Sequence, residues 1–143
     1  MKPIIKITGI LLLTLLIFAC KDEMIQSGAE VTVSTDRTTY NPGQLITITV
    51  NNYTNKTVYI NQCGANLYST IIKIDSSSSG GTSFTPVCRH LTSYELSAGQ
   101  SVSDTLSFLL PGKYKLKYLY DFENIMPELC REKLYTNEFN IQQ

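Results

Sequence analysis

The sequence predicts an all-β protein, folded as one antiparallel β-sandwich of seven to eight strands over residues 30–143. Three observations lead to this prediction. Apolar and polar residues alternate with a period of two in most segments after residue 29, which is typical of strands that bury one face. Pro-Gly and Ala-Gly pairs punctuate these segments. No stretch of about a dozen residues carries a helical stripe of apolar side chains.

The expected strands are seven segments with this alternation or with a run of β-branched residues. They are residues 31–34, 46–50, 57–60, 71–74, 105–110, 113–122 and 139–141. In the fifth segment Leu106, Phe108 and Leu110 are expected to face the core. In the sixth, the core-facing set is Tyr114, Leu116, Tyr118, Tyr120 and Phe122, and the opposite set includes Lys113, Lys115 and Lys117. Residues 123–133, interrupted by Pro127, predict one helical turn at most.

Three four-residue segments predict tight turns that precede strands. They are 41–44 (Asn-Pro-Gly-Gln), 97–100 (Ser-Ala-Gly-Gln) and 110–113 (Leu-Pro-Gly-Lys). Proline sets φ to about −65° and glycine accepts a positive φ, so each segment suits a type II turn. By contrast, residues 75–83 are rich in serine and glycine and predict a mobile hairpin loop.

Composition narrows the function. The chain has 143 residues, which favours one domain, and 12 basic residues balance 12 acidic ones. This balance argues against a nucleic acid partner. One histidine and no hydrolase, phosphate-loop or metalloprotease motif argue against an enzyme, a metal and a cofactor.

The first 19 residues have the pattern of an export signal. Lys2 and Lys6 precede an apolar run at residues 10–19, which is shorter than the roughly 20 residues of a membrane span and ends at Cys20. The small Ala19 followed by Cys20 resembles a bacterial lipobox. The resemblance implies cleavage before Cys20 and acylation of its thiol and new amino group. An ordinary signal peptide or anchor helix with an incidental cysteine is the alternative.

The residues after Cys20 refine the expected location. Lys21, Asp22 and Glu23 resemble the signal that sends lipoproteins of Bacteroidota to the outer face of the outer membrane. Without that signal, the periplasmic face would be expected. Residues 21–29 are polar and aperiodic, so residues 20–29 are expected to be the lipidated Cys20 followed by a flexible tether to the domain.

Three cysteines remain in the exported domain, and an oxidising compartment favours a disulfide. We prefer Cys63–Cys88, because each is expected to end a strand beside the Ser/Gly loop; Cys130 is then left over, and the other two pairings stay open. Cys63, Cys88, His90 and Cys130 are also a possible zinc set, although none of them has Cys-x-x-Cys spacing. Cys88 and His90 are alternatively a nucleophile and its base, if Cys88 is free.

Residues 110–114 (Leu-Pro-Gly-Lys-Tyr) resemble the tyrosine corner of immunoglobulin-like and fibronectin-like domains, in which the tyrosine hydroxyl bonds to upstream backbone. Together with the turn layout over residues 30–142, this resemblance implies an immunoglobulin-like sandwich. The layout is also similar to that of the BsuPI type of extracellular protease inhibitors. Asp104, Thr105 and Leu106 resemble an O-glycosylation site of Bacteroidota.

These features predict a lipid-anchored module of the cell envelope that binds a protein or a glycan and is not an enzyme. The expected recognition segments are residues 63–70 and 76–90. A protease inhibitor acting through an exposed loop and a structural envelope component are the alternatives. The lysines of residues 113–117 are candidates for anionic headgroups or glycans, and sugar-stacking or protein-contacting candidates are Tyr53, Tyr59, Tyr68 and Tyr94. Solvent exposure of the lysines and packing of the tyrosines are the plainer interpretations.

Overall fold

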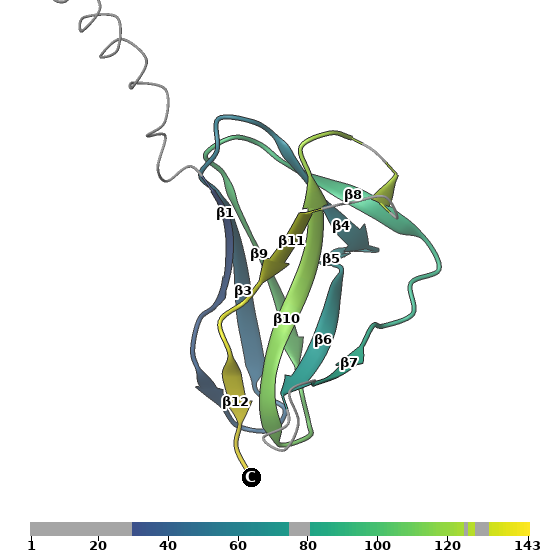
Figure 1. Cartoon of the computed structure of the whole chain (residues 1–143). Helices are drawn as coiled ribbons and strands as arrows, with labels where there is room; N and C mark the ends of the chain where they lie inside the picture. The colour runs from purple at the N-terminus through teal and green to yellow at the C-terminus, as the bar shows by residue number, and fades with distance from the viewer. Residues whose placement is uncertain (1–29, 75–80, 125, 128–131) are drawn as a thin grey trace, which may run out of the picture.

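Strand β3 (Leu45–Asn52) follows the predicted alternation: Ile46, Ile48 and Val50 are fully buried, and the threonines between them are half-buried. The computed structural model describes residues 30–74, 81–124, 126–127 and 132–143, which form twelve strands in two sheets (Figure 1). The prediction of an all-β sandwich is confirmed. Within these residues no helix has the length and hydropathy needed to cross a membrane.

The smaller sheet contains three antiparallel strands in the order β1 (Val31–Thr35), β3 and β9 (Ser101–Ser107). Their register aligns Val33, Val50 and Val102 in one row. Side chains in such a row project to the same side of a sheet, so this sheet presents β-branched residues to the core.

The larger sheet is built around the long strand β10 (Gly112–Asp121). One edge of β10 pairs with β6 (Ser69–Ile74) and then β4 (Val58–Cys63), and the other pairs with β11 (Glu132–Tyr135) and β12 (Phe139–Ile141). The remaining strands are β2 (Thr39–Tyr40), β5 (Asn66–Leu67), β7 (Thr82–Phe84) and β8 (Leu91–Leu96). Figure 1 shows this sheet facing the smaller one, with β10 along most of its length.

The strand inventory differs from the prediction in detail. Twelve strands are present instead of seven to eight, because β2, β5 and β7 are only two or three residues long and β8 and β11 carry little alternation. The sandwich is not wholly antiparallel, since β2 pairs with β12 in parallel. Strand β9 ends at Ser107, so Leu110 is exposed rather than core-facing, and Phe122 is also exposed.

The core lies between the two sheets and takes most of the β10 residues that alternation assigned to it. Tyr114, Leu116 and Tyr118 are buried there, and Tyr120 is partly buried against it. Phe139 of β12 packs edge-on against Tyr40, with ring centroids 5.8 Å apart. Burying such large rings supplies much of the apolar contact in so small a domain.

Two of the three predicted turns have the expected geometry. Gly43 and Gly99 have φ values of +76° and +71°, and Gln44 and Gln100 donate backbone hydrogen bonds to the carbonyls of Asn41 and Ser97. These are features of type II turns. The third glycine, Gly112, has a φ of +150°, far from the roughly +80° of a type II turn. The turn before β10 is therefore of another kind.

Candidate functional site

The turn between β9 and β10 is closed by the predicted tyrosine corner. The hydroxyl of Tyr114 donates a hydrogen bond of 3.0 Å to the backbone carbonyl of Leu110, so this expectation is confirmed. The ring of Tyr114 stacks on Phe108 at a centroid distance of 5.0 Å and an interplanar angle of 16°. Both contacts fix the path of residues 108–110, and the side chains of these residues form one wall of a groove.

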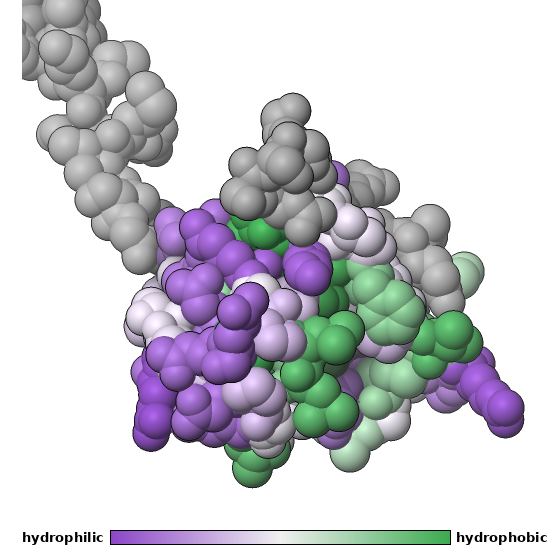
Figure 2. All heavy atoms as spheres, turned by 90° about the horizontal axis from the view of Figure 1, so that it is seen from below, coloured by the Kyte–Doolittle hydropathy of each residue, from purple (hydrophilic) through white to green (hydrophobic). Residues whose placement is uncertain are grey.

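This first wall is apolar and lies in solvent. Leu109 and Leu110 are 76% and 70% exposed, and Phe108 is half-buried against the core. Soluble monomers rarely expose contiguous apolar surface, and where they do, that surface is often a contact site. The two consecutive exposed leucines therefore indicate a contact site. Figure 2 shows hydrophobic side chains gathered on one part of this end of the molecule, beside a hydrophilic region.

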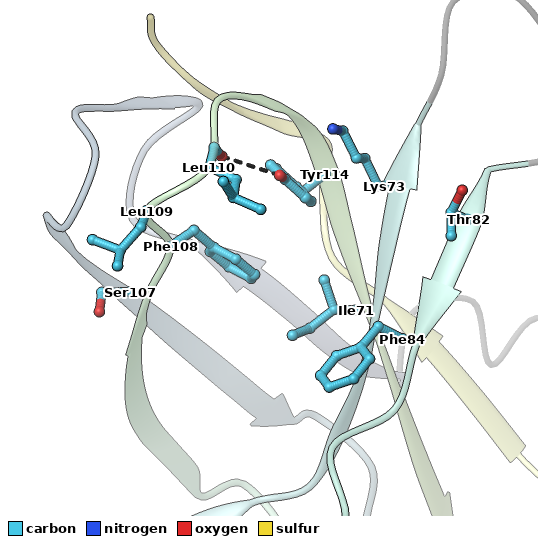
Figure 3. A pocket seen from close by; sticks show the side chains of 9 residues that line it. All are labelled: Ile71, Lys73, Thr82, Phe84, Ser107, Phe108, Leu109, Leu110 and Tyr114. Atoms are coloured by element: carbon cyan, nitrogen blue, oxygen red, sulfur yellow. Dashed lines mark hydrogen bonds between the residues drawn. The ribbon is translucent and has the colours of Figure 1, made fainter.

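The second wall comes from the β6–β7 hairpin across the groove. Ile71 and Phe84 are register partners there, as are Lys73 and Thr82, and Phe84 is 62% exposed. Figure 3 shows these four side chains on one side of the groove and the 107–110 segment on the other. This open groove has a volume of about 580 Å³, within the usual range for ligand sites.

Lys73 is the charged residue of this lining. It pairs in register with the buried Tyr114, so both side chains project to the inner side of the sheet. A Cβ added at Gly112 would lie 3.0 Å from Cε of Lys73 and 3.3 Å from the Tyr114 ring. Glycine at 112, with its positive φ, thus leaves room for the lysine stem at the mouth of the groove.

A second hollow, of about 260 Å³, lies further along the same seam between the sheets. It shares Ile71 with the first groove and is lined in part by Leu106 and by Cys63. The two hollows therefore follow the side of the sandwich where β9 faces β5, β6 and β7.

The segment after β7 is held at two points. The hydroxyl of Tyr68 donates a hydrogen bond of 2.5 Å to the carbonyl of Pro86, and Cys88 forms a disulfide with Cys63. The preferred pairing is thus confirmed, although Cys88 lies between β7 and β8 and does not end a strand. Between the two anchors, Val87 is 93% exposed.

The disulfide corrects two alternatives raised by the sequence. A disulfide sulfur is not a thiolate, so Cys63 and Cys88 are not available as zinc ligands and Cys88 is not a nucleophile. The sulfur of Cys88 contacts the backbone carbonyl of His90 at 3.3 Å, and that contact does not involve the imidazole.

Four of the predicted lysine and tyrosine candidates have structural partners. On the outer face of β10, Lys113 forms an ion pair with Glu138, and Lys115 lies over the ring of Tyr135, 5.3 Å from its centroid. The Lys113 ammonium holds the pKa of Glu138 below its ordinary value. Tyr68 is engaged with Pro86, and Tyr94 packs against the core. Tyr53, which directly follows β3, is exposed.

Other predicted residues have a mixed outcome. Cys20, Lys21, Asp22, Glu23 and Cys130 lie outside the described residues, as do the signal peptide 1–19, the tether 20–29 and residues 75–80 of the predicted 75–83 loop. The end of that loop was predicted wrongly, since Thr82 and Ser83 belong to β7. Segment 63–70 is mostly strand and not an open loop. Segment 76–90 contributes Thr82 and Phe84 to the groove. The opposite wall was missed, although three apolar residues before Pro111-Gly112 were a signal for it.

No family model matches the chain, and no curated protein matches it. Among solved structures, it is similar to an alkylpurine DNA glycosylase AlkC from Pseudomonas fluorescens, at 16% identity and a TM-score of 0.41, over 82% of this chain and 32% of that one. A β-glucosidase from Listeria innocua follows, at 13% identity and a TM-score of 0.40, over 80% and 16% of the two chains. The chain thus spans a third or less of both proteins. PapD-like domain 7 of human CEP192 is 16% identical, with a TM-score of 0.30 and coverage of 83% and 88%. These scores are too low to carry a conclusion about function.

Proposed function

We propose that the protein is a lipid-anchored lipoprotein of the outer membrane, exposed at the cell surface, whose β-sandwich binds another protein. The location is supported by the lipobox-like Cys20 and by the Lys21-Asp22-Glu23 signal. The binding role is supported by one observation above all, the apolar groove between residues 107–110 and the β6–β7 hairpin. Removing its exposed leucines and Phe84 from water against a partner would lower the free energy, which favours binding.

The groove suits a protein partner better than a glycan. Sugar sites combine an aromatic platform with several hydrogen-bonding side chains, whereas the polar groups here are few: Lys73, Thr82, Ser107 and the Tyr114 hydroxyl. That hydroxyl already donates to Leu110. Apolar walls with few polar groups favour apolar side chains of a protein.

The proposed location is tested with the full chain in cells. Mass spectrometry of the mature protein is expected to find acyl chains on Cys20, and Cys20→Ala is expected to leave the protein unattached to membranes. Two or three acyl chains give stable anchoring, so the release should be nearly complete. Neutral substitutions of Lys21, Asp22 and Glu23 should protect the protein from protease added to whole cells. Unchanged membrane attachment of the Cys20 variant would reject the anchor.

The binding role is tested by photo-crosslinking in the same cells. A benzoylphenylalanine at position 109, on the groove wall, is expected to give adducts of discrete mass. The matched control carries the same residue at position 53, an exposed tyrosine at the other end of β3. Phe84→Glu should reduce the adducts at 109, because it places a charge in the apolar wall. Equal adducts at both positions would contradict a binding role for the groove.

A protease inhibitor is the second candidate, and one observation favours it. Val87 presents an apolar side chain to solvent on a segment fixed by the Tyr68–Pro86 hydrogen bond and the Cys63–Cys88 disulfide. A rigid, exposed segment loses little conformational entropy when it enters a protease cleft. Inhibition of extracellular proteases by the purified protein, lost in Val87→Asp and kept in Val87→Ile, would support this function. No inhibition across a broad panel would reject it.

A further inference from the structure

The groove is bordered by a strand with an open edge. Strand β7 pairs with β6, and in the described part of the chain it pairs with no other strand. Across the seam β9 pairs with β3 alone in that same part. Open strand edges carry backbone donors and acceptors that can pair with an added strand. The groove therefore offers backbone hydrogen bonds beside its apolar walls.

The two residues of β7 that line the groove set two levels along it. Thr82 and Phe84 line it, while Ser83 between them does not. Phe84 lies opposite Ile71, so one level is apolar, and Thr82 lies opposite Lys73, so the next level is cationic. A strand added along β7 would direct every second side chain toward the groove. Its first inward side chain would lie beside Phe84 and the next beside Thr82. Lys73 lies one strand further, on β6, with its Cε beside Gly112, so its long side chain would turn toward β7 to reach that second side chain.

Charge complementarity selects the chemistry of the second side chain. The ion pairs among the described residues are Arg37–Asp36 and Lys113–Glu138, and Lys73 takes part in neither. Lys73 is half-buried beside apolar side chains, where an opposite charge interacts more strongly than at a fully solvated site. A carboxylate is the group that the lysine would receive at this level.

We infer that the groove binds an extended peptide segment of the partner by strand addition to β7, with an apolar and an acidic side chain two residues apart. The apolar side chain packs against Phe84 and Ile71, and the carboxylate pairs with Lys73. Backbone hydrogen bonds to β7 supply affinity, and the two inward side chains supply selectivity. This inference rests on the proposed function, since it assigns the chemistry of the partner at the same groove.

The test uses the full-length lipoprotein in lipid nanodiscs and a library of random heptapeptides. Selected peptides are expected to carry an apolar and an acidic residue separated by one position. Against Lys73→Gln their affinity should fall about tenfold, the equivalent of roughly 1.4 kcal/mol. Lys73→Glu should instead select a basic residue at that position. Lys117→Gln, on the outer face of β10, is the matched control and should leave binding unchanged.

Further variants separate strand addition from simple apolar contact. Phe84→Glu is expected to lower affinity at least tenfold, and circular dichroism checks that it folds. N-methylation of one alternate set of peptide amides should abolish binding, and N-methylation of the other set should not, because an added strand turns alternate amides toward β7. Equal loss of binding with both sets, or no loss with either, would overturn strand addition.

The outcomes distinguish this inference from the function on which it rests. Peptides that need Phe84 but show no acidic preference and bind Lys73→Gln equally would overturn the inference and leave the groove as a protein-binding site. A library without groove-dependent binders, together with adducts at position 109, would overturn the peptide mode alone. A library without such binders and equal adducts at 109 and 53 would overturn both.

Discussion

The backbone amide of Leu67, on β5, donates a hydrogen bond of 2.7 Å to Oδ2 of Asp104, on β9. It joins the two sheets at the seam that carries the groove. The amide of Thr105 donates to the other carboxylate oxygen, also at 2.7 Å. Burial raises the pKa of the nearby Tyr118 well above its ordinary value. A hydrogen bond with Ser69 lowers this pKa, and the charge of Asp104 raises it.

Asp104→Ala is therefore expected to lower the free energy of unfolding by about 1–3 kcal/mol, because it leaves the buried Leu67 amide without its acceptor. Asp104→Asn retains an oxygen at this position and should cost less. Urea unfolding of both variants measures the difference, with Ser103→Ala on the exposed face of β9 as a control. Equal losses in the two Asp104 variants would show that the bond to Leu67 contributes nothing.

Tyr114→Phe removes the hydroxyl that bonds to Leu110 and keeps the ring that stacks on Phe108. We expect the free energy of unfolding to fall by about 1 kcal/mol. Binding at the groove should also weaken, because the 108–110 wall loses a restraint. Urea unfolding and the crosslinking assay measure these effects. Tyr135→Phe, at an exposed tyrosine, should change neither, and an equal effect there would contradict the role of the corner.

The corner itself was predictable from the sequence, whereas the groove was not. A Pro-Gly turn and a tyrosine four residues after Leu110 define the corner locally, so the motif is sufficient. The groove requires Phe84 and Leu110 to lie on its opposite walls, although they are 26 positions apart in the sequence. Alternation also assigned Leu110 to the core, because period-two reasoning continues a strand past the point where β9 ends.

The short strands were missed for a related physical reason. Strand β2 has two residues, and its pairing partner β12 lies at the other end of the chain. No local pattern records such a contact. The Cys63–Cys88 pairing was preferred because of the oxidising compartment and the place of both cysteines beside the Ser/Gly loop. The exposure of Val87, by contrast, depends on where Tyr68 holds the backbone of Pro86. Long-range contacts therefore set most of the candidate site.

Replacing both disulfide cysteines by serine is expected to lower the free energy of unfolding by about 3.5 kcal/mol, from the chain entropy of the loop that the disulfide closes. The two cysteines are 25 residues apart in the sequence. Urea unfolding of Cys63→Ser/Cys88→Ser measures the loss, and reduction of the native protein should reproduce it. A loss below about 1 kcal/mol would contradict a stabilising disulfide.

Asn52 is fully buried and joins two turns through its side chain. Its amide nitrogen donates to the carbonyls of Lys56 and Leu96, at 2.8 and 3.0 Å, and its oxygen accepts from Thr54. Asn52→Ala should cost about 2–4 kcal/mol, because several buried groups lose partners together. The neighbouring Asn51→Ala, half-buried, is the matched control in urea unfolding. Similar losses at both positions would refute the special role of Asn52.

Asp36 gives the stability of the domain a predictable dependence on pH. Burial raises the pKa of this carboxyl, but hydrogen bonds from the Tyr40 hydroxyl and the Thr47 amide outweigh burial and hold it below its ordinary value of 3.8. A carboxyl whose pKa is lower in the folded state stabilises the fold above its unfolded-state pKa. That contribution is lost as the pH falls from 3.8 through the folded-state value.

Asp36→Asn should therefore be less stable than the native protein near pH 7, and the difference should shrink as the pH falls below about 4. Tyr40→Phe removes the strongest of the bonds that lower this pKa, so it should move the acid loss of stability toward higher pH. Urea unfolding between pH 7 and 2.5 measures both effects. If the stability difference between Asp36→Asn and the native protein stays constant over this range, the Asp36 carboxylate is not linked to folding. The Tyr40 hydroxyl would then stabilise the fold through its bonds to the Arg37 backbone alone.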